Sequence, residues 1–372
     1  MRWCNRCVLP LSSAVTIELD DEGVCSACRV HEQKKYIDWD ERLNILLEDI
    51  EIYRKSSGYE CLIGVSGGKD SYYQVHFVKE KLGLNPLLVT YNGNNYLDIG
   101  WQNLVKMKEV FNVDHYIVSP SVDLLIRLNR LGFTMMGDMN WHNHAGIATL
   151  PMQLAVKFGI PLVFWGEHGW TDLGGMHSMH DFVEYTARFR KDQQMRGYDW
   201  YDMVGREDEP IAEQEMEIFK YPTDEEISKI DLRGLFIGNF DIWDANAHTK
   251  LVKERYEWQE SPVPFERTYR RFSNLDDRYE NGAHDYLKYI KFGYGRATDH
   301  ACKDIRSGYL SREEGIKLVR QYDHVRPSDL DFWLNYVNRD QEWFTKIADT
   351  FRRPDVWSKD NDDKWTKVNL WD

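Results

Sequence analysis

The chain has 372 residues and a formal net charge of −14 at neutral pH, which is enough chain for two or three domains of about 100–200 residues each. The acidic balance argues against a general nucleic-acid binder, because such a protein needs a basic face to neutralise phosphates. No apolar run approaches the roughly 18 residues of a membrane span. Residues 1–15 hold Arg2 and two cysteines and do not resemble a signal peptide. We therefore expect a cytoplasmic protein without a membrane or nucleic-acid partner.

Two CxxC pairs stand near the N-terminus, Cys4 with Cys7 and Cys25 with Cys28. Their spacing is typical of a zinc ribbon, in which four thiolates close a tetrahedral structural site. About 30 residues cannot bury enough apolar surface to fold alone, so a metal is expected here. Redox cysteines, disulfides and an iron–sulfur cluster are the alternatives. Residues 15–23, between the pairs, are predicted to form a strand and a turn.

A glycine-rich loop follows a helix predicted over residues 38–55 and a short buried strand predicted at residues 62–65. The loop consists of Ser66, Gly67, Gly68, Lys69, Asp70 and Ser71. A helix is predicted directly after it, over residues 72–82. At a strand–loop–helix junction the backbone N–H groups converge and the helix N-terminus adds positive charge, which predicts a phosphate site. The two glycines allow positive φ and close approach of a phosphate, and Lys69 is expected to add a mobile positive charge.

This loop is not a Walker A motif, which needs Ser or Thr after the Gly-Lys pair where this chain has Asp70. It resembles the pyrophosphate loop (PP-loop) of the N-type ATP pyrophosphatases, a family that contains GMP, NAD and asparagine synthetases and tRNA-thiolating enzymes. The resemblance implies that ATP is cleaved between its α and β phosphates, with an adenylated substrate and released pyrophosphate. The alternative is a Gly-Gly turn that only begins a helix.

Strands and helices alternate through the next hundred residues. Strands are predicted at residues 86–91, 114–118 and 160–165, and helices at 99–111, 122–131 and, in part, 145–158, where Pro151 argues for a helix start or a kink. The alternation predicts an α/β fold with a doubly wound parallel sheet. Ligands then bind at the carboxyl ends of the strands, where Asn92, Gly166 and Glu167 stand. We predict a zinc ribbon at 1–36, an ATP pyrophosphatase domain at 37–245 and a mostly helical C-terminal region at 246–372.

Two polar groups in the middle of the chain are candidates for chemistry. Asp138, His142 and His144 lie close together in sequence; they can bind a second metal, serve as acid–base groups, contact a substrate, or belong to an ordinary loop. Glu167 and Asp172 follow the last predicted strand and are candidate ligands of the Mg²⁺ that accompanies ATP, because this ion prefers oxygen ligands.

The complete set of motifs resembles one family. A CxxC ribbon, the PP-loop, and residues 137–144, 165–168 and 292–300 follow one another in the order found in the N-acetyl sugar amidotransferases of the WbpG type. These proteins of lipopolysaccharide and of pseudaminic or legionaminic acid synthesis convert an acetamido group into an acetamidino group. The resemblance implies that ATP adenylates the amide carbonyl and that ammonia then displaces AMP.

Site residues are predicted from these motifs. Arg296, Asp299 and His300 follow a Gly-X-Gly bend and are interpreted as a substrate wall, because arginine suits bidentate contact with a carboxylate or phosphate. The predicted catalytic residues are Lys69, Asp70 and Glu167. The predicted contacts of ATP are Ser66, Gly67, Gly68, Lys69, Asp70, Ser71, Asn92 and Gly166. The predicted substrate contacts are His142, His144, His168, Arg296, Asp299 and His300.

No cysteine has the context of a glutaminase nucleophile. Four are assigned to the ribbon, Cys61 lies on a predicted buried strand and Cys302 lies in a charged, helical segment. The resemblance therefore implies a separate glutaminase, and a channel-forming subunit similar to those of histidine biosynthesis, that supply ammonia. We expect them to dock on the aromatic-rich C-terminal region. Two other functions stay open: a PP-loop tRNA 2-thiolation enzyme, which needs persulfide cysteines or an iron–sulfur cluster near the loop, and a nucleotide-binding scaffold without catalysis.

Overall fold

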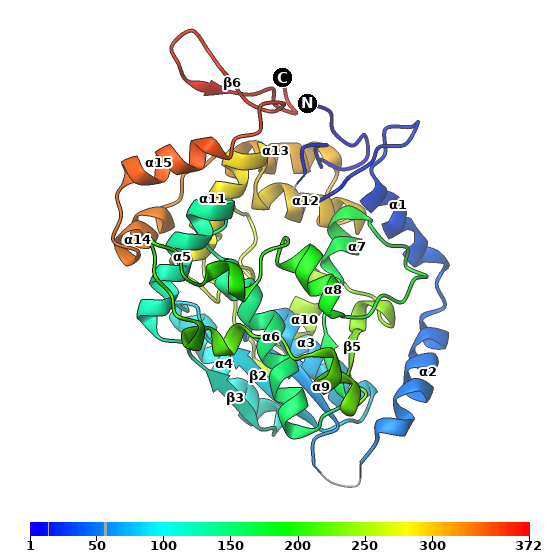
Figure 1. The fold of residues 1–372 in the computed structure, drawn as a ribbon. Coiled ribbons are helices and arrows are strands. Elements are labelled where there is room, and N and C mark those ends of the chain that lie inside the picture. Colours follow the sequence, from blue (N-terminus) through cyan, green and yellow to red (C-terminus); the bar gives the residue numbers. More distant parts are fainter. Residues whose placement is uncertain (14, 56–57) are drawn as a thin grey trace.

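A parallel sheet of five strands forms the centre of the protein (Figure 1). The computed structural model describes residues 1–13, 15–55 and 58–372. The strands are β1 (Cys61–Gly64), β2 (Pro86–Tyr91), β3 (His115–Val118), β4 (Leu162–Trp165) and β5 (Arg233–Phe236). Their order is β3-β2-β1-β4-β5, so the winding reverses between β1 and β4, where a crevice forms at the carboxyl ends of the strands. The predicted fold class is confirmed, with β5 as a strand that the sequence did not indicate.

Helices cover both faces of the sheet because neighbouring strand residues point to opposite sides. Ile63 of β1 packs with α2 (Trp39–Ile50), α3 (Lys69–His76), α4 (Asp98–Phe111) and α10 (Ala245–Tyr256). Leu62 packs with α5 (Val122–Met136) and α6 (Trp141–Phe158) on the other face. Pro151 lies inside α6 and neither starts nor ends the helix, so the predicted helix start at this residue is wrong. Three shorter helices follow β4: α7 (Gly169–Gly174), α8 (Ala187–Phe189) and α9 (Asp224–Lys229).

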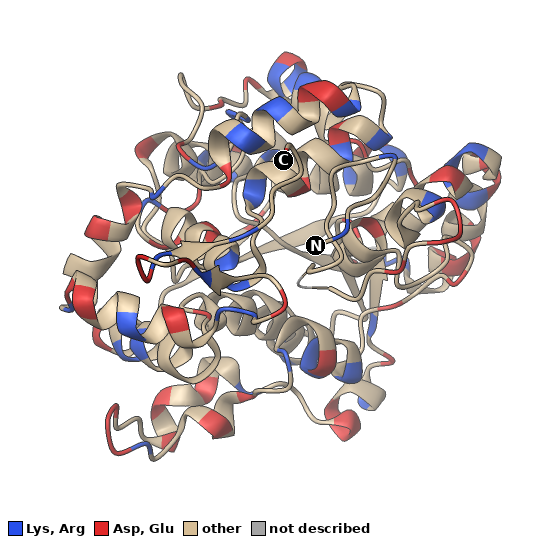
Figure 2. Ribbon diagram, turned by 90° about the horizontal axis from the view of Figure 1, so that it is seen from above, with Lys and Arg blue, Asp and Glu red and all other residues tan. Residues whose placement is uncertain are grey.

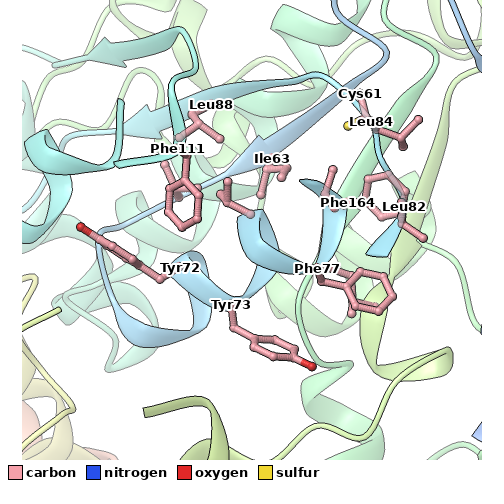
Figure 3. Packing of buried hydrophobic residues seen from close by; sticks show 14 of the residues in the cluster. Cys61, Ile63, Tyr72, Tyr73, Phe77, Leu82, Leu84, Leu88, Phe111 and Phe164 are labelled. Atoms are coloured by element: carbon pink, nitrogen blue, oxygen red, sulfur yellow. The ribbon is translucent and has the colours of Figure 1, made fainter. Parts of the chain in front are cut away.

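The helix after the glycine-rich loop is anchored by aromatic side chains. Tyr72, Tyr73 and Phe77 come from α3 and the π-helical turn that continues it over Phe77–Lys81. The ring of Tyr72 packs against Phe111, and all three side chains belong to the buried cluster that contains Ile63 (Figure 3). Tyr72 and Phe77 are fully buried. Aromatic rings bury a large apolar area each, so this packing fixes the start of α3, and with it the loop, relative to the sheet.

The C-terminal region is mostly helical, as predicted. Its helices are α11 (Glu280–Phe292), α12 (Arg296–Arg306), α13 (Arg312–Tyr322), α14 (Asp329–Tyr336) and α15 (Gln341–Thr350). Trp333 and Phe344 from α14 and α15 pack with Phe133 of α5 in a separate buried cluster. A short hairpin, β6 (Ser358–Lys359) with β7 (Trp365–Thr366), follows α15 and projects from the body (Figure 1).

The N-terminal cysteine segment lies against the C-terminal helices, at the top of Figure 1. Its helix α1 is Ser26–Gln33, and Cys7 and Cys25 are buried together with Ala301 of α12 and Val319 of α13. The strand predicted for residues 15–23 is wrong, because only an isolated pairing of Leu19 with Cys25 occurs there. Chain segments far apart in sequence therefore share one apolar cluster.

Two properties of the described helices can be compared with the composition: their apolar length and the distribution of their charges. None of them is long and apolar enough to cross a membrane. Seen from above, Lys and Arg alternate with Asp and Glu on most of the outer helices (Figure 2).

Candidate active site

The glycine-rich loop is held by bonds to its carbonyl oxygens. Tyr96 donates its hydroxyl to the carbonyl of Ser66 at 3.2 Å, and Trp258 donates its indole N–H to the carbonyl of Gly67 at 2.9 Å. The N–H of Ser66 donates to the hydroxyl of Ser71 at 2.9 Å. Gly67 has a φ of +76°, which an L side chain rarely adopts. These bonds fix the loop next to the first turn of α3, whose N–H groups have no partner within the helix and can bind an anion.

Lys69 and Asp70 form an ion pair at the start of α3. Lys69 is 7% exposed and its ammonium group lies 2.5 Å from Asp70, so it is not the mobile charge that we predicted. Burial opposes ionisation of Asp70, but Lys69 and His248 outweigh it and keep the pKa of Asp70 below its ordinary value. Gly68 has a φ of −68°, so only Gly67 uses the left-handed region. An incoming phosphate would compete with Asp70 for Lys69.

Three cavities meet outside the carboxyl ends of β1 and β4. The loop cavity, of about 260 Å³, is lined by Ser66, Gly68 and Lys69. The middle cavity, of about 250 Å³, shares Lys69 and His300 with it. The large cavity, of about 400 Å³, shares Glu167 with the middle one. Because Arg296 lines all three, they form one connected site at the switch point of the sheet.

Helix α12 supplies the wall opposite the glycine-rich loop. The guanidinium of Arg296 donates to Asp285 at 2.9 Å. Asp299 accepts a bond from Lys288. The ring of His300 bonds the hydroxyl of Thr268 at 2.6 Å, and burial, together with Arg270 and Arg296, holds the pKa of His300 well below its usual range. The structure thus brings the three residues of the predicted substrate wall to the cavities, with His300 neutral.

Glu167 and Asp172 share one cation at the end of β4. The ammonium of Lys303 lies 2.5 Å from Glu167 and 2.8 Å from Asp172. Burial raises the pKa of Glu167, whereas Lys303, Lys34 and Arg306 outweigh burial at Asp172 and lower its pKa. Lys303 occupies the place that a metal ion would take between the two carboxylates. These residues therefore do not fit a magnesium site unless Lys303 moves away. Magnesium that arrives with ATP is held mainly by phosphate oxygens and needs few protein ligands, so ATP binding does not require this pair.

Two of the predicted substrate contacts are not among the residues that line the three cavities. His142 is fully buried, 2.9 Å from Glu280 and 3.1 Å from the hydroxyl of Tyr91, so it joins α6 to α11 and β2. His168 accepts the N–H of Thr171 and begins α7. These placements do not support the substrate contacts predicted for His142 and His168.

Of the predicted ATP contacts outside the loop, Gly166 lies at the site and Asn92 does not. Gly166 lines the large cavity. Asn92 stands at the end of β2 and donates to the hydroxyl of Ser119 at 2.9 Å, and it is not among the residues that line the three cavities. Asn92 thus lies at the expected edge of the sheet without reaching the site.

Sequence reasoning missed a polar stripe on α11. His284, Lys288 and Lys291 line the large cavity and recur at positions i, i+4 and i+7, which is the spacing of one helix face. His284 lies 3.4 Å from Asp138, and His144 lies 3.9 Å from it. The helical spacing of the three basic residues was a usable signal, but nothing in the sequence indicated that this face meets residues 138–144.

The four N-terminal cysteines fit a zinc ion. Cys4 and Cys28 have their sulfur atoms 3.9 Å apart, and Cys7 and Cys25 3.8 Å. A tetrahedron with zinc–sulfur bonds of about 2.3 Å has edges of about 3.8 Å, whereas a disulfide needs about 2.05 Å. All four cysteines are buried, and their sulfur atoms lie within 4.8 Å of one another. The geometry therefore fits the predicted tetrathiolate zinc site.

Comparison with known proteins identifies the region that carries α11 to α15. Residues 266–370 match the family described as "LPS biosynthesis protein WbpG-like, C-terminal domain". This region is similar to the C-terminal domain of WbpG-like proteins. The match confirms the family resemblance seen in the motifs, and the WbpG-like domain supplies Arg296, Asp299 and His300 to the site.

Other relatives are more distant. An uncharacterized protein of Methanocaldococcus jannaschii, MJ1599, is 28% identical over 118 residues, which are 31% of this chain and 42% of that protein. An NH3-dependent NAD synthetase from Campylobacter jejuni aligns over 39% of this chain and 63% of its own with 16% identity and a TM-score of 0.30. An NMN synthetase from Francisella tularensis aligns over 61% of this chain and 99% of its own with 14% identity and a TM-score of 0.30.

Proposed function

We propose that the protein is an ATP-dependent amidotransferase that converts the acetamido group of a sugar into an acetamidino group, with release of AMP and pyrophosphate. One observation carries the proposal. Lys69 and Asp70 of the PP-loop and Arg296 and His300 of the WbpG-like domain line the same cavities. A phosphate-binding loop and the substrate wall of a WbpG-like domain thus face each other across one site.

The reaction balances without a further co-reactant. The amide oxygen attacks the α-phosphate of ATP, and the bond to the β-phosphate breaks to release pyrophosphate. Ammonia then adds to the activated carbon, a proton is lost, and AMP leaves with the original amide oxygen. In this proposal the N–H groups at the start of α3, together with Lys69, stabilise the charge on the departing pyrophosphate; their position at the loop cavity supports this role.

The shapes of the cavities suggest how the two substrates are arranged. The loop cavity beside Lys69 suits phosphates. The large cavity, of about 400 Å³, has the size of a small-molecule site, with aromatic walls from Trp165 and Tyr185 and polar groups from His144 and Lys288. We assign the sugar to the large cavity and its acetamido group to the side near Arg296, where the cavities join.

Sulfur transfer to tRNA is the less favoured alternative. It needs an accessible thiol near the loop, but Cys61 and Cys302 are 0% and 1% exposed, and burial raises the pKa of each thiol. Neither cysteine lines the three cavities. A thiol that is buried and protonated is a poor sulfur carrier.

Mass spectrometry tests the reaction directly. The protein is incubated with ATP, ammonium and a panel of acetamido sugars, free and nucleotide-linked. Replacement of oxygen by NH lowers the mass of the sugar by one unit, and AMP and pyrophosphate should form in equal amounts. Release of ADP and phosphate would contradict the PP-loop assignment, and ATP binding without any turnover would favour a scaffold.

Lys69→Ala should lower turnover by about 10²–10³-fold, because a donor to the leaving group is removed. Lys108→Ala is the matched control, since Lys108 is an exposed lysine on α4 and its removal should leave turnover unchanged. Equal activity in Lys69→Ala and wild type would remove the PP-loop from the mechanism.

The nitrogen donor is tested in the same assay. Because the cysteines of the described chain are buried, we propose that the protein uses ammonia from a separate glutaminase and does not hydrolyse glutamine. The purified protein should act with high ammonium and fail with glutamine alone. Activity with glutamine in the absence of a second protein would overturn this part of the proposal.

A further inference from the structure

Asp138, His144 and His284 gather at one wall of the large cavity. Asp138 lies just before α6, His144 in its first turn and His284 in the second turn of α11. One ligand atom of each residue lies within 4.8 Å of the other two. His144 and His284 line the cavity, while Asp138 is 2% exposed behind them. The group joins two helices that are about 140 residues apart in the chain.

The spacing of these atoms is close to that of metal ligands. Nε2 of His284 lies 3.4 Å from Oδ1 of Asp138, and Nε2 of His144 lies 3.9 Å from Oδ2. Bonds of about 2.0–2.2 Å to a tetrahedral ion place neighbouring ligand atoms about 3.3–3.5 Å apart. His284 is at this distance from Oδ1, whereas His144 is further away and faces the other oxygen, so the side chains have to shift for one ion to bind all three. The buried Nε2 of His144 has no hydrogen-bond partner among the described residues.

The surroundings orient the carboxylate toward the two rings. The backbone N–H of Asn140 donates to Oδ1 of Asp138 at 3.1 Å, which fixes the side-chain rotamer and leaves a second lone pair on that oxygen. Nδ1 of His284 lies 4.0 Å from Asp285, which is too far for a hydrogen bond, and Asp285 accepts from Arg296 at 2.9 Å. His142, which the sequence placed in this group, is bonded to Glu280 and takes no part.

We propose that Asp138, His144 and His284 bind one divalent cation of the zinc, iron or manganese type, with its open coordination positions facing the large cavity. Two imidazoles and one carboxylate are a ligand set that these ions accept. Three protein ligands leave room for water or a substrate oxygen, as in catalytic metal centres, whereas the four cysteines close their site completely. This site is separate from the tetrathiolate site, and its existence does not depend on the proposed reaction.

Arg196 competes with such an ion. Its guanidinium lies 3.0 Å from Oδ2 of Asp138, and its side chain is 38% exposed. The exposed arginine can turn away into the cavity, but its positive charge beside the carboxylate weakens cation binding. Arg196 therefore offers a variant whose effect on metal affinity is opposite in sign to that of the ligand variants.

Titration with Co²⁺ tests the proposal on protein that retains its structural zinc. Cobalt held by nitrogen and oxygen lacks the sulfur charge-transfer bands of a thiolate site, so the two sites are distinguished in one spectrum. We expect one additional cobalt per chain without those bands. His144→Gln and His284→Gln should each weaken its binding by more than about 100-fold, since even outer-shell changes cost about 10–100-fold, and Arg196→Gln should tighten binding about tenfold.

His324→Gln is the matched control, because His324 is exposed and outside the group; it should bind cobalt as the wild type does. Zinc content and thermal unfolding are measured for every variant. Cobalt binding that shows only thiolate bands, or nitrogen–oxygen binding that survives the double His144→Gln/His284→Gln change, would overturn the proposal. If the histidine variants fail to fold, unchanged affinity in Arg196→Gln would overturn it.

Discussion

Substitution of the two glycines in the glycine-rich loop separates the stability of this loop from its proposed binding of phosphate. A Cβ on Gly67 would lie 2.7 Å from the backbone N and Cα atoms of Leu104 on α4, and Gly67 has a φ of +76°. The left-handed backbone costs a side chain about 1–2 kcal/mol, and a clash with backbone that cannot move aside adds about 1–3 kcal/mol. Gly67→Ala should therefore lower the free energy of unfolding by about 2–5 kcal/mol.

Gly68→Ala is the matched control for stability. Gly68 has a φ of −68°, and the nearest atom to an added Cβ is the hydroxyl of Ser66 at 3.5 Å, an ordinary contact. This variant should lose no more than about 1 kcal/mol, the usual scale of a change at a helix N-cap. Gly68 lines the loop cavity, so the added methyl group should weaken ATP binding by about tenfold or more, equivalent to about 1.4 kcal/mol.

Urea unfolding followed by tryptophan fluorescence measures stability, and calorimetric titration with ATP measures affinity. If Gly67→Ala proves as stable as the wild type, the close approach of the loop to Leu104 is refuted. If Gly68→Ala binds ATP normally, phosphates do not contact the backbone at the start of α3.

Two further predictions concern the metal and the pH dependence. Cys4→Ser and Cys28→Ser should each abolish the one tightly bound zinc and lower the unfolding temperature, whereas Cys61→Ser should keep the zinc; metal analysis under reducing conditions that finds no zinc in the wild type would reject the ribbon. Burial and the nearby Glu266 raise the pKa of Asp329 to about 6. The folded state then binds more protons than the unfolded state, so stability falls as pH rises from about 4 to 6. Asp329→Asn should remove this fall and stabilise the protein at pH 8 by about 1–2 kcal/mol after allowance for solvent screening, but not at pH 4; an equal effect at both pH values would contradict the assignment.

The central part of the fold could be predicted because local pattern and tertiary structure agree there. The apolar run before Ser66, the loop and the helical spacing after it gave β1, the turn and α3 in the correct places. Strand β5 could not be recognised, because Arg233–Phe236 offers only a short apolar run that periodicity cannot assign. The helix start predicted at Pro151 was wrong for a different reason. The proline ring packs against Gly64 of β1, and burial of α6 on the sheet offsets the hydrogen bond that proline cannot donate.

The site was predictable where its residues follow a strand or a bend, and not where it depends on which helix faces which. Arg296 and His300 were found because they follow a Gly-X-Gly bend, and Glu167 because it follows a strand. His142 and His144 are two positions apart and looked equivalent, but on a helix this spacing turns them to different sides. His142 therefore meets Glu280 while His144 reaches the cavity. Only the packing of α11 against α6 brings His284 to Asp138.

Helix α12 connects the cysteine site to the candidate active site. Arg296 and His300, near its start, line the cavities, whereas Cys302 is buried among the N-terminal cysteines. Arg306, at its end, donates to the carbonyl of Asp172 at 2.7 Å, and its buried Nε and Nη2 have no hydrogen-bond partner among the described residues.

The pKa of Arg306 also depends on the charge of the cysteine site. Burial disfavours its positive charge, but the nearby sulfur groups of the cysteine site, that of Cys7 above all, outweigh this and raise the pKa of Arg306. A zinc ion with four thiolates carries a net charge of about −2, which a buried guanidinium helps to balance. Removal of zinc would therefore free Arg306 and the end of α12 together, and turnover should fall in proportion to zinc content before the sheet unfolds. Full activity in a zinc-free protein that remains folded would show that the cysteine site does not support the wall of the active site.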